Sequence, residues 1–223
     1  MFDYNRGYAP DIETSGIMDV FRLPKFAWYF YRSQTIEGPV CFIASHNLPS
    51  SGNIVRVYSN ADTVKLFRND TLIAVQGPDT DINAVNLLHP PFTFTLPDYS
   101  PGTLKATTLR NGKESASHSV TTPGRPAAIR LSADFSNKPL RADNADVIFV
   151  YATVTDSAGN QVYTSDTMVE FALRGNASLI GDNPARAEGG IATILLRAED
   201  GGKIMIKASS PGMSEAELMT VSK

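Results

Sequence analysis

Apolar and polar residues alternate along most of the chain after Val40. Such a period of two is typical of half-buried β-strands, because successive side chains point to opposite faces of a sheet. The alternation is interrupted every few residues by polar or glycine-containing turns. In the first part of the chain it predicts strands at 54–57, 64–67, 72–75, 92–96 and 102–107.

Turn sequences between these strands predict hairpins at Ser59–Asp62 and at Arg68–Asp70. The strongest hairpin signal is Arg110–Lys113, because Asn111-Gly112 accepts the positive φ angles of a type I′ turn. The first β region then ends at Thr121–Pro126, where two prolines flank a glycine and predict a short, semi-rigid joint.

A second β region follows this joint. Five apolar runs and a sixth near the end predict its strands, at 128–131, 147–154, 168–171, 191–196, 203–208 and 216–221. About 100 residues with this number of strands is the size of an immunoglobulin-like sandwich. The chain is therefore expected to be mainly β, with two immunoglobulin-like β-sandwiches in tandem at 36–122 and 123–223.

Residues 1–35 have a different pattern. Pro24 suits the first turn of a helix that continues through Tyr31. Aromatic residues occupy almost every side of this helix, so it is expected to be buried on more than one side. The two sandwiches alone do not obviously supply all the partners it needs.

Composition narrows the classes of function. The 223 residues carry a formal net charge of −3 and a charged share of 19%, which gives no excess of basic surface for binding nucleic acid. No run approaches the roughly 18 to 20 apolar residues that cross a membrane, and the first residues lack a signal-peptide pattern. Because the chain opens inside a structured-looking motif, an excised fragment is expected. The single cysteine, Cys41, lies in an apolar run, is expected to be buried, and allows no internal disulfide.

The sequence contains no recognisable catalytic or metal-binding motif. Most acidic residues stand in turns, where Asp bonds its own backbone; Asp156 begins such a turn, through Gly159. The three histidines, His46, His89 and His118, have no metal-binding spacing. The glycine pairs after Glu188 and Asp200 precede strands rather than helices, which predicts hairpin turns rather than phosphate-binding loops. Neither a metal nor a cofactor is expected.

Three segments together resemble the C-terminal part of bacterial β-galactosidase-like enzymes of glycoside hydrolase family 2. Residues 2–8, 15–22 and 24–25 resemble the last strand and closing helix of that family's catalytic (β/α)₈ barrel. Residues 57–69 resemble the strand pair that opens its fourth domain. Residues 101–106 and 124–131 resemble the end of that domain and the start of a fifth, invasin-like domain.

The resemblance implies that residues 1–35 are a remnant of the barrel, and that its parent is a retaining O-glycosyl hydrolase of carbohydrate metabolism. The family's two catalytic glutamates lie on earlier barrel strands, and neither Glu13 nor Glu37 stands in a matching context. The chain alone is therefore expected to be inactive. Residues at the end of the last barrel strand lie on the active-site face. Two interpretations remain open: the four residues there bind sugar in the parent, or they only connect strand to helix. They are Asp3, Tyr4, Asn5 and Arg6.

The first expectation for function is accessory: the sandwiches support the barrel or an oligomer interface, and the partner is the rest of the parent enzyme. The alternatives are a carbohydrate-binding module and a surface adhesion domain. Sugar binding normally needs exposed aromatic side chains, whereas packing in the core or at an edge is their commoner role. The resemblance also suggests that the parent is periplasmic or secreted. The aromatic residues available for a sugar are Tyr58, Phe92, Tyr99 and Tyr163.

Overall fold

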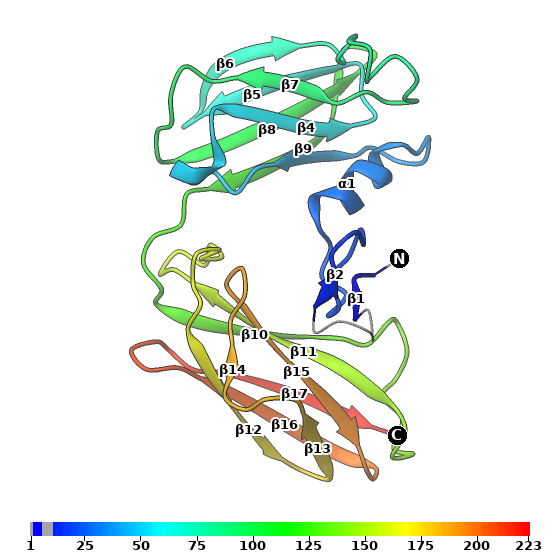
Figure 1. Ribbon diagram of the computed structural model, residues 1–223, viewed down its shortest axis with the longest axis vertical. Coiled ribbons are helices and arrows are strands. Elements are labelled where there is room, and N and C mark those ends of the chain that lie inside the picture. The colour runs from blue at the N-terminus through cyan, green and yellow to red at the C-terminus, as the bar shows by residue number, and fades with distance from the viewer. Residues whose placement is uncertain (1, 6–10) are drawn as a thin grey trace. The chain divides into compact units, whose positions relative to one another are not determined.

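The computed structural model describes residues 2–5 and 11–223 and is mainly β (Figure 1). The chain forms two compact units, Met1–Thr122 and Pro123–Lys223. Each unit contains a sandwich of two antiparallel sheets around its own apolar core, so the prediction of a mainly β chain with two sandwiches and a short helical segment is confirmed. The predicted division of the first unit at residue 35 stays a prediction.

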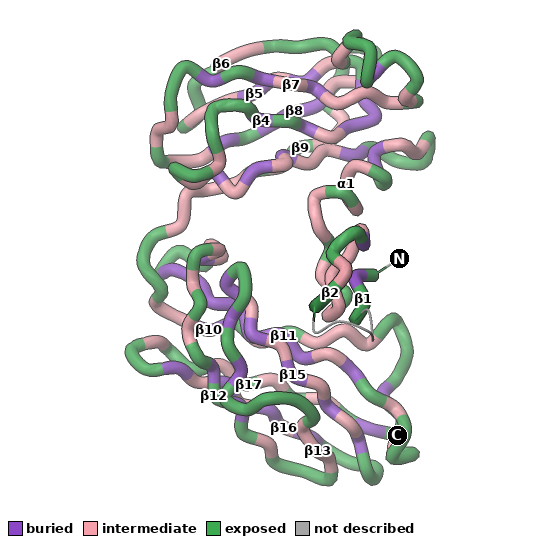
Figure 2. Tube along the Cα trace, viewed as in Figure 1, coloured by how far each residue is buried: buried purple, intermediate pink, exposed green. Residues whose placement is uncertain are grey.

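The sandwich of the first unit pairs a three-stranded sheet, β3-β4-β7, with a four-stranded sheet, β6-β5-β8-β9. Buried residues alternate with less buried ones along β4, β5 and β7 (Figure 2). The inward residues include Leu66, Phe92 and Phe94, each at most 1% exposed. The strands are β3 (Cys41–Ala44), β4 (Ile54–Ser59), β5 (Thr63–Arg68), β6 (Thr71–Gln76), β7 (Phe92–Thr95), β8 (Thr103–Arg110) and β9 (Lys113–Thr121), and η1 (Pro49–Ser51) is a short 3-10 helix.

Two of the three predicted turns are hairpins. Arg110 pairs with Lys113 across Asn111 and Gly112, whose φ angles of 51° and 75° are those of a type I′ turn. Arg68 pairs with Thr71 in the hairpin between β5 and β6. The prediction for Ser59–Asp62 was wrong, because this turn leads from β4 into a strand of the other sheet. Turn residues alone do not specify which sheet the next strand joins.

The sandwich of the second unit pairs sheet β10-β11-β15-β13 with sheet β14-β12-β16-β17. Its core is built from aliphatic side chains of both sheets, with alanines opposite each other at Ala152 and Ala192. The strands are β10 (Ala128–Asp134), β11 (Val147–Thr155), β12 (Met168–Arg174), β13 (Ala177–Ile180), β14 (Ala185–Arg186), β15 (Ile191–Ala198), β16 (Gly202–Ser209) and β17 (Ala216–Ser222).

The turns of the second unit correct the sequence interpretation in one respect. The glycine pair after Glu188 forms the predicted hairpin turn: Glu188 and Ile191 exchange backbone hydrogen bonds of 2.9 and 3.0 Å across Gly189 and Gly190, whose φ angles are 57° and 78°. The pair after Asp200 links β15 to β16 of the other sheet, so the prediction of a hairpin turn there was wrong. The turn that begins at Asp156 is as predicted, with Gly159 at a φ of 86° and the Asp156 N–H donating to the Asn160 carbonyl. The pattern gave no sign of the short strands β13 and β14.

Helix α1 (Phe26–Ser33) begins two residues later than predicted. Pro24 lies before the helix, where it forms a bridge with Met18. One face of α1 packs on the first sandwich, where Tyr29 contacts Phe42 of β3. On another face, Tyr31 is 62% exposed. No helix among residues 2–5 and 11–223 is long and apolar enough to cross a membrane.

Candidate functional site

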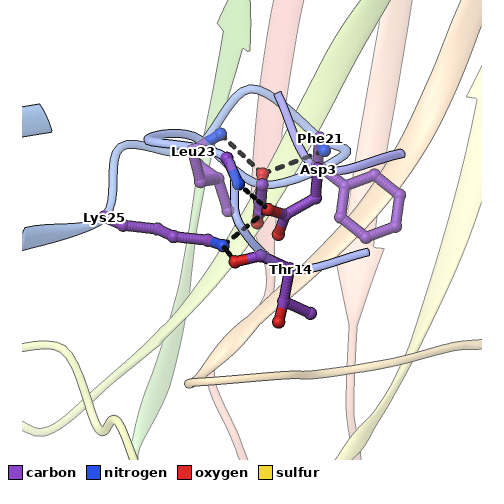
Figure 3. A network of polar contacts seen from close by, with 7 residues as sticks. Asp3, Thr14, Phe21, Leu23 and Lys25 are labelled. Carbon is purple, nitrogen blue, oxygen red and sulfur yellow. Dashed lines mark hydrogen bonds and ion pairs between the residues drawn. The ribbon is translucent and has the colours of Figure 1, made fainter. Parts of the chain in front are cut away.

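The N-terminal lobe, defined here as residues 2–5 and 11–25, is organised around the carboxylate of Asp3 (Figure 3). Asp3 is buried at 8% exposure, and its Oδ1 accepts hydrogen bonds from Gly16 N at 2.8 Å and from Lys25 Nζ at 2.6 Å. Lys25 Nζ also donates to the Thr14 carbonyl at 2.8 Å. The charge of Asp3 therefore joins three separate segments of the lobe.

Backbone contacts complete this lobe. The N–H of Asp3 donates to Met18 O at 2.9 Å, and strand β1 (Tyr4–Asn5) pairs antiparallel with β2 (Ile12–Glu13). A Cβ atom at Gly16 would stand 2.3 Å from Asp3 N, so only glycine fits there. The close approach of the backbone around Asp3 to that around Gly16 therefore requires a glycine at position 16.

A second carboxylate, that of Asp19, closes the loop before Lys25. Its Oδ1 accepts from Phe21 N at 2.9 Å and from Leu23 N at 2.8 Å. Burial raises the pKa of Asp19, against the opposite effect of these two hydrogen bonds. Asp19 therefore shapes a tight loop within the lobe.

The structure divides the four residues predicted to line a sugar site. Asp3 is engaged internally, whereas Tyr4 is 57% exposed and Asn5 is also exposed, both on the short strand β1. Arg6 lies outside the described residues. Their role toward a sugar stays a prediction. Sequence alone could not distinguish a buried, ion-paired aspartate from one that faces a ligand.

The aromatic residues considered for sugar binding are not open platforms. Phe92 is fully buried in the core of the first sandwich. Tyr58 packs edge-on against Phe30, with ring centroids 5.5 Å apart, and Tyr99 and Tyr163 are half-buried. Phe92 and Tyr58 therefore pack within the first unit, whereas a role of Tyr99 or Tyr163 in sugar binding stays a prediction.

The most extensive aromatic contact in the first unit joins α1 to a helix platform, which comprises Phe42, His46, Tyr58 and His118. Tyr29 stacks on Phe42 with ring centroids 3.5 Å apart and an angle of 4° between the rings. Phe26 lies 4.8 Å from the His46 ring and 5.9 Å from that of Phe42. The aromatic helix was predictable from the sequence, but this platform was not. The signal that could have indicated it was the outward positions of Phe42 and Tyr58 in their strands.

Polar contacts hold the end of α1 as well. The side chain of Gln34 donates to the His89 carbonyl at 2.7 Å and accepts from the His89 N–H at 3.1 Å. Beyond the helix, the Asn60 amide donates to the carbonyls of Thr35 and Gly38, each at 2.9 Å, and accepts from Val40 N at 2.9 Å. The segment between helix and sandwich is therefore fixed at several points.

The histidines are structural in their contacts. His46 and His118 belong to the helix platform, and His89 bonds Gln34 through its backbone. Across the described part of the chain, no group of three or more His, Cys, Asp or Glu side chains is arranged to hold a metal ion. The thiol of Cys41 is half-buried, and burial raises its pKa to about 12.

Family models match part of each sandwich. Residues 129–219 match the family model described as glycoside hydrolase family 2 C-terminal domain 5. Residues 54–116 match a domain of unknown function (DUF4982).

Curated relatives match almost the whole chain. A β-galactosidase of Thermoanaerobacter pseudethanolicus is 33% identical over 99% of this chain, and β-galactosidase BoGH2A of Bacteroides ovatus is 30% identical over 91% of it. The chain spans only 32% and 25% of these two relatives. Among solved structures, a β-glycosidase from Bacteroides vulgatus shares the fold with a TM-score of 0.82 at 22% identity, and the match covers 99% of this chain and 30% of that one.

Proposed function

Because the chain belongs to the C-terminal portion of glycoside hydrolase family 2 enzymes, we propose that it is a non-catalytic accessory region of a larger β-galactosidase-like hydrolase. In this proposal residues 1–35 are the final part of the catalytic barrel. The two sandwiches then hold that end of the barrel in place.

The attachment of α1 to the first sandwich is the observation that carries the proposal. Tyr29 stacks on Phe42, and Gln34 and Asn60 fix the chain on either side of residue 35. A helix held by both aromatic and polar contacts transmits the position of the sandwich to whatever else packs on it. The open face around Tyr31 is available for the rest of a barrel.

We extend the proposal to the predicted sugar-site residues. Asp3 acts as a positioning residue, because its pairing with Lys25 and Gly16 fixes the lobe from which β1 emerges. Tyr4 and Asn5 follow it on that strand with exposed side chains, and would face the sugar in the parent enzyme. Arg6, which belongs to the same predicted set, is assigned no geometry.

The activity of the purified chain tests the accessory role. We expect no hydrolysis of nitrophenyl β-galactoside or nitrophenyl β-glucuronide above the rate of a buffer blank. Turnover that copurifies with the folded chain through two different columns would contradict the proposal.

A second experiment tests the supporting role directly. In the full-length enzyme, Tyr29→Ala should lower the melting temperature of the catalytic region, since it removes the stack on Phe42, while Tyr31→Ser leaves the α1–platform contact intact. Equal melting temperatures for Tyr29→Ala and the unmodified enzyme would exclude a supporting role for α1.

A further inference from the structure

Two edge strands of the first sandwich meet at a seam made by side chains. Strand β3 is bonded to β4 alone, and β9 to β8 alone, so each presents an unpaired edge. The imidazole of His118 on β9 fills this gap, because its Nδ1 accepts the N–H of Ile43 on β3 at 3.1 Å. Ile43 is fully buried, so its N–H has no access to water if this bond is lost.

The same imidazole supports the platform for α1. The His118 ring lies 4.8 Å from the ring of Phe42, and Phe42 is the residue on which Tyr29 of α1 stacks. One side chain therefore contributes both to the seam between the sheets and to the surface that binds the helix.

This arrangement requires a neutral imidazole. A protonated histidine carries a hydrogen on both ring nitrogens and cannot accept a hydrogen bond, so the N–H of Ile43 would then face another donor. Removing the acceptor from a buried donor is more costly than the bond itself is stabilising.

The groups around His118 also favour its neutral form. Burial lowers the pKa of His118 and, on the other side of the platform, that of His46. The titratable neighbours Cys41, Tyr29 and Tyr58 all have raised pKa values, chiefly through burial, and stay neutral. Arg32 acts on Tyr29 and Arg56 on Tyr58, and both side chains carry a positive charge. Within the described residues no carboxylate pairs with His118.

We infer that the seam between β3 and β9 is an acid-sensitive latch, and that protonation of His118 loosens the attachment of α1 to the first sandwich. The direction follows from the pKa. A histidine whose pKa is lower in the folded state than its ordinary 6.5 leaves stability intact above pH 6.5. That contribution falls as the pH drops below 6.5 and is lost once the pH passes the folded-state value.

The single tryptophan of the chain, Trp28, allows a direct test because it lies on α1. Its ring contacts Tyr29 at 4.9 Å and lies beneath the Arg32 guanidinium at 5.3 Å. Between pH 7.5 and 5.0 we expect a reversible red shift of the Trp28 emission in the full chain, with unchanged far-ultraviolet circular dichroism. An emission spectrum that is constant over this range would overturn the inference.

The variant His118→Asn separates the latch from general acid effects. The Asn carbonyl oxygen can take the place of Nδ1 as acceptor and does not titrate, so the red shift should disappear above pH 5.0. His89→Asn serves as the matched control and should keep most of it, because His89 bonds Gln34 through its backbone. A shift of unchanged size in His118→Asn would refute the assignment to His118.

A measurement on the unmodified chain tests the inference even if the His118→Asn variant does not fold. Proton NMR of the His118 ring should give a pKa below 6.5 that coincides with the midpoint of the Trp28 transition. A midpoint that differs from the His118 pKa by more than one unit would assign the transition to other groups and contradict the inference.

Discussion

Both sandwiches hold the segment that enters them with one polar side chain from a turn, but the two side chains differ in chemistry. In the first unit the neutral amide of Asn60 bonds two carbonyls and the Val40 N–H. In the second the carboxylate of Asp156 accepts the N–H of Gly124 at 2.8 Å, together with two N–H groups of its own turn.

The difference follows from what each entering segment presents. The segment before β3 exposes both acceptors and a donor, and only an amide can satisfy both kinds. The segment before β10 offers an N–H alone, for which a carboxylate is the stronger acceptor. Asn60 and Asp156 are called the first and the second clamp below. Hydrogen bonds from the backbone of Gly124 and from Asn160 lower the pKa of Asp156 to about 2, so the second clamp stays charged over the ordinary range of pH.

The largest expected effect tests whether the two units are separate folding units. Phe92 fills the first core and is fully buried, so Phe92→Ala should destabilise that unit by about 3–5 kcal/mol. Trp28 reports only this unit, and its thermal transition should move to a lower temperature. Phe171→Ala, at a buried position of the second core, should leave the Trp28 transition in place. If both variants shift it equally, the units do not unfold separately.

Removing the first clamp should have the next largest effect. Asn60→Ala leaves the buried Val40 N–H without its acceptor and should cost about 1–3 kcal/mol in the free energy of unfolding measured by urea titration. Asn86→Ala, at an exposed turn position, is the control and should change it by less than about 0.5 kcal/mol. Equal changes in the free energy of unfolding for the two variants would show that the hydrogen bonds of Asn60 do not stabilise the first unit.

Exchanging the two clamp chemistries sharpens the comparison. Asn60→Asp keeps an acceptor for Val40 N but sets a negative charge against the carbonyls of Thr35 and Gly38. Asp156→Asn turns part of an acceptor into a donor that faces the Gly124 N–H. Both variants should melt at lower temperatures than the unmodified chain by differential scanning calorimetry. A neutral result for either would show that size rather than hydrogen-bond polarity selects the residue.

The smallest effect appears only in strong acid. Because the pKa of Asp156 is lowered from 3.8 to about 2, its contribution to stability is present above pH 3.8 and is lost as the pH falls toward 2. The difference in melting temperature between the unmodified chain and Asp156→Asn should thus be constant from pH 7 to pH 5 and shrink below pH 3.8. A difference that is unchanged at pH 2 would show that the charge of Asp156 is not the source of stability.

Many of the strands were predictable because a strand that is buried on one face has apolar and polar residues in alternation. This held for β4, β5 and β15, and the Asn111-Gly112 hairpin followed from backbone sterics. Strands β13 and β14 were not predictable, since burial does not alternate along the four residues of β13, and the two residues of β14 are too few to show a period. The predictions of connections that cross between sheets were wrong for another reason. A turn sequence sets the local φ and ψ angles, whereas the sheet that the next strand joins depends on packing in the whole core.

The site was less predictable than the fold. Asp3 and Tyr4 are adjacent in sequence, yet one is buried beside Lys25 and the other points to solvent. Their difference depends on Gly16 and Lys25, which are 13 and 22 residues away from Asp3. Contacts over such separations leave no local pattern. The resemblance to a family supplied the context, but not the geometry.

The stack of Tyr29 on Phe42 determines where the first unit can be divided without exposing apolar surface. A gene fragment cut at residue 35 would transfer a sandwich whose outer sheet displays Phe42 and Tyr58 without the helix that covers them. Exposed aromatic surface of this kind promotes aggregation. The helix and the first sandwich are therefore best kept together, and a chain that begins after α1 should be less soluble than one that includes it.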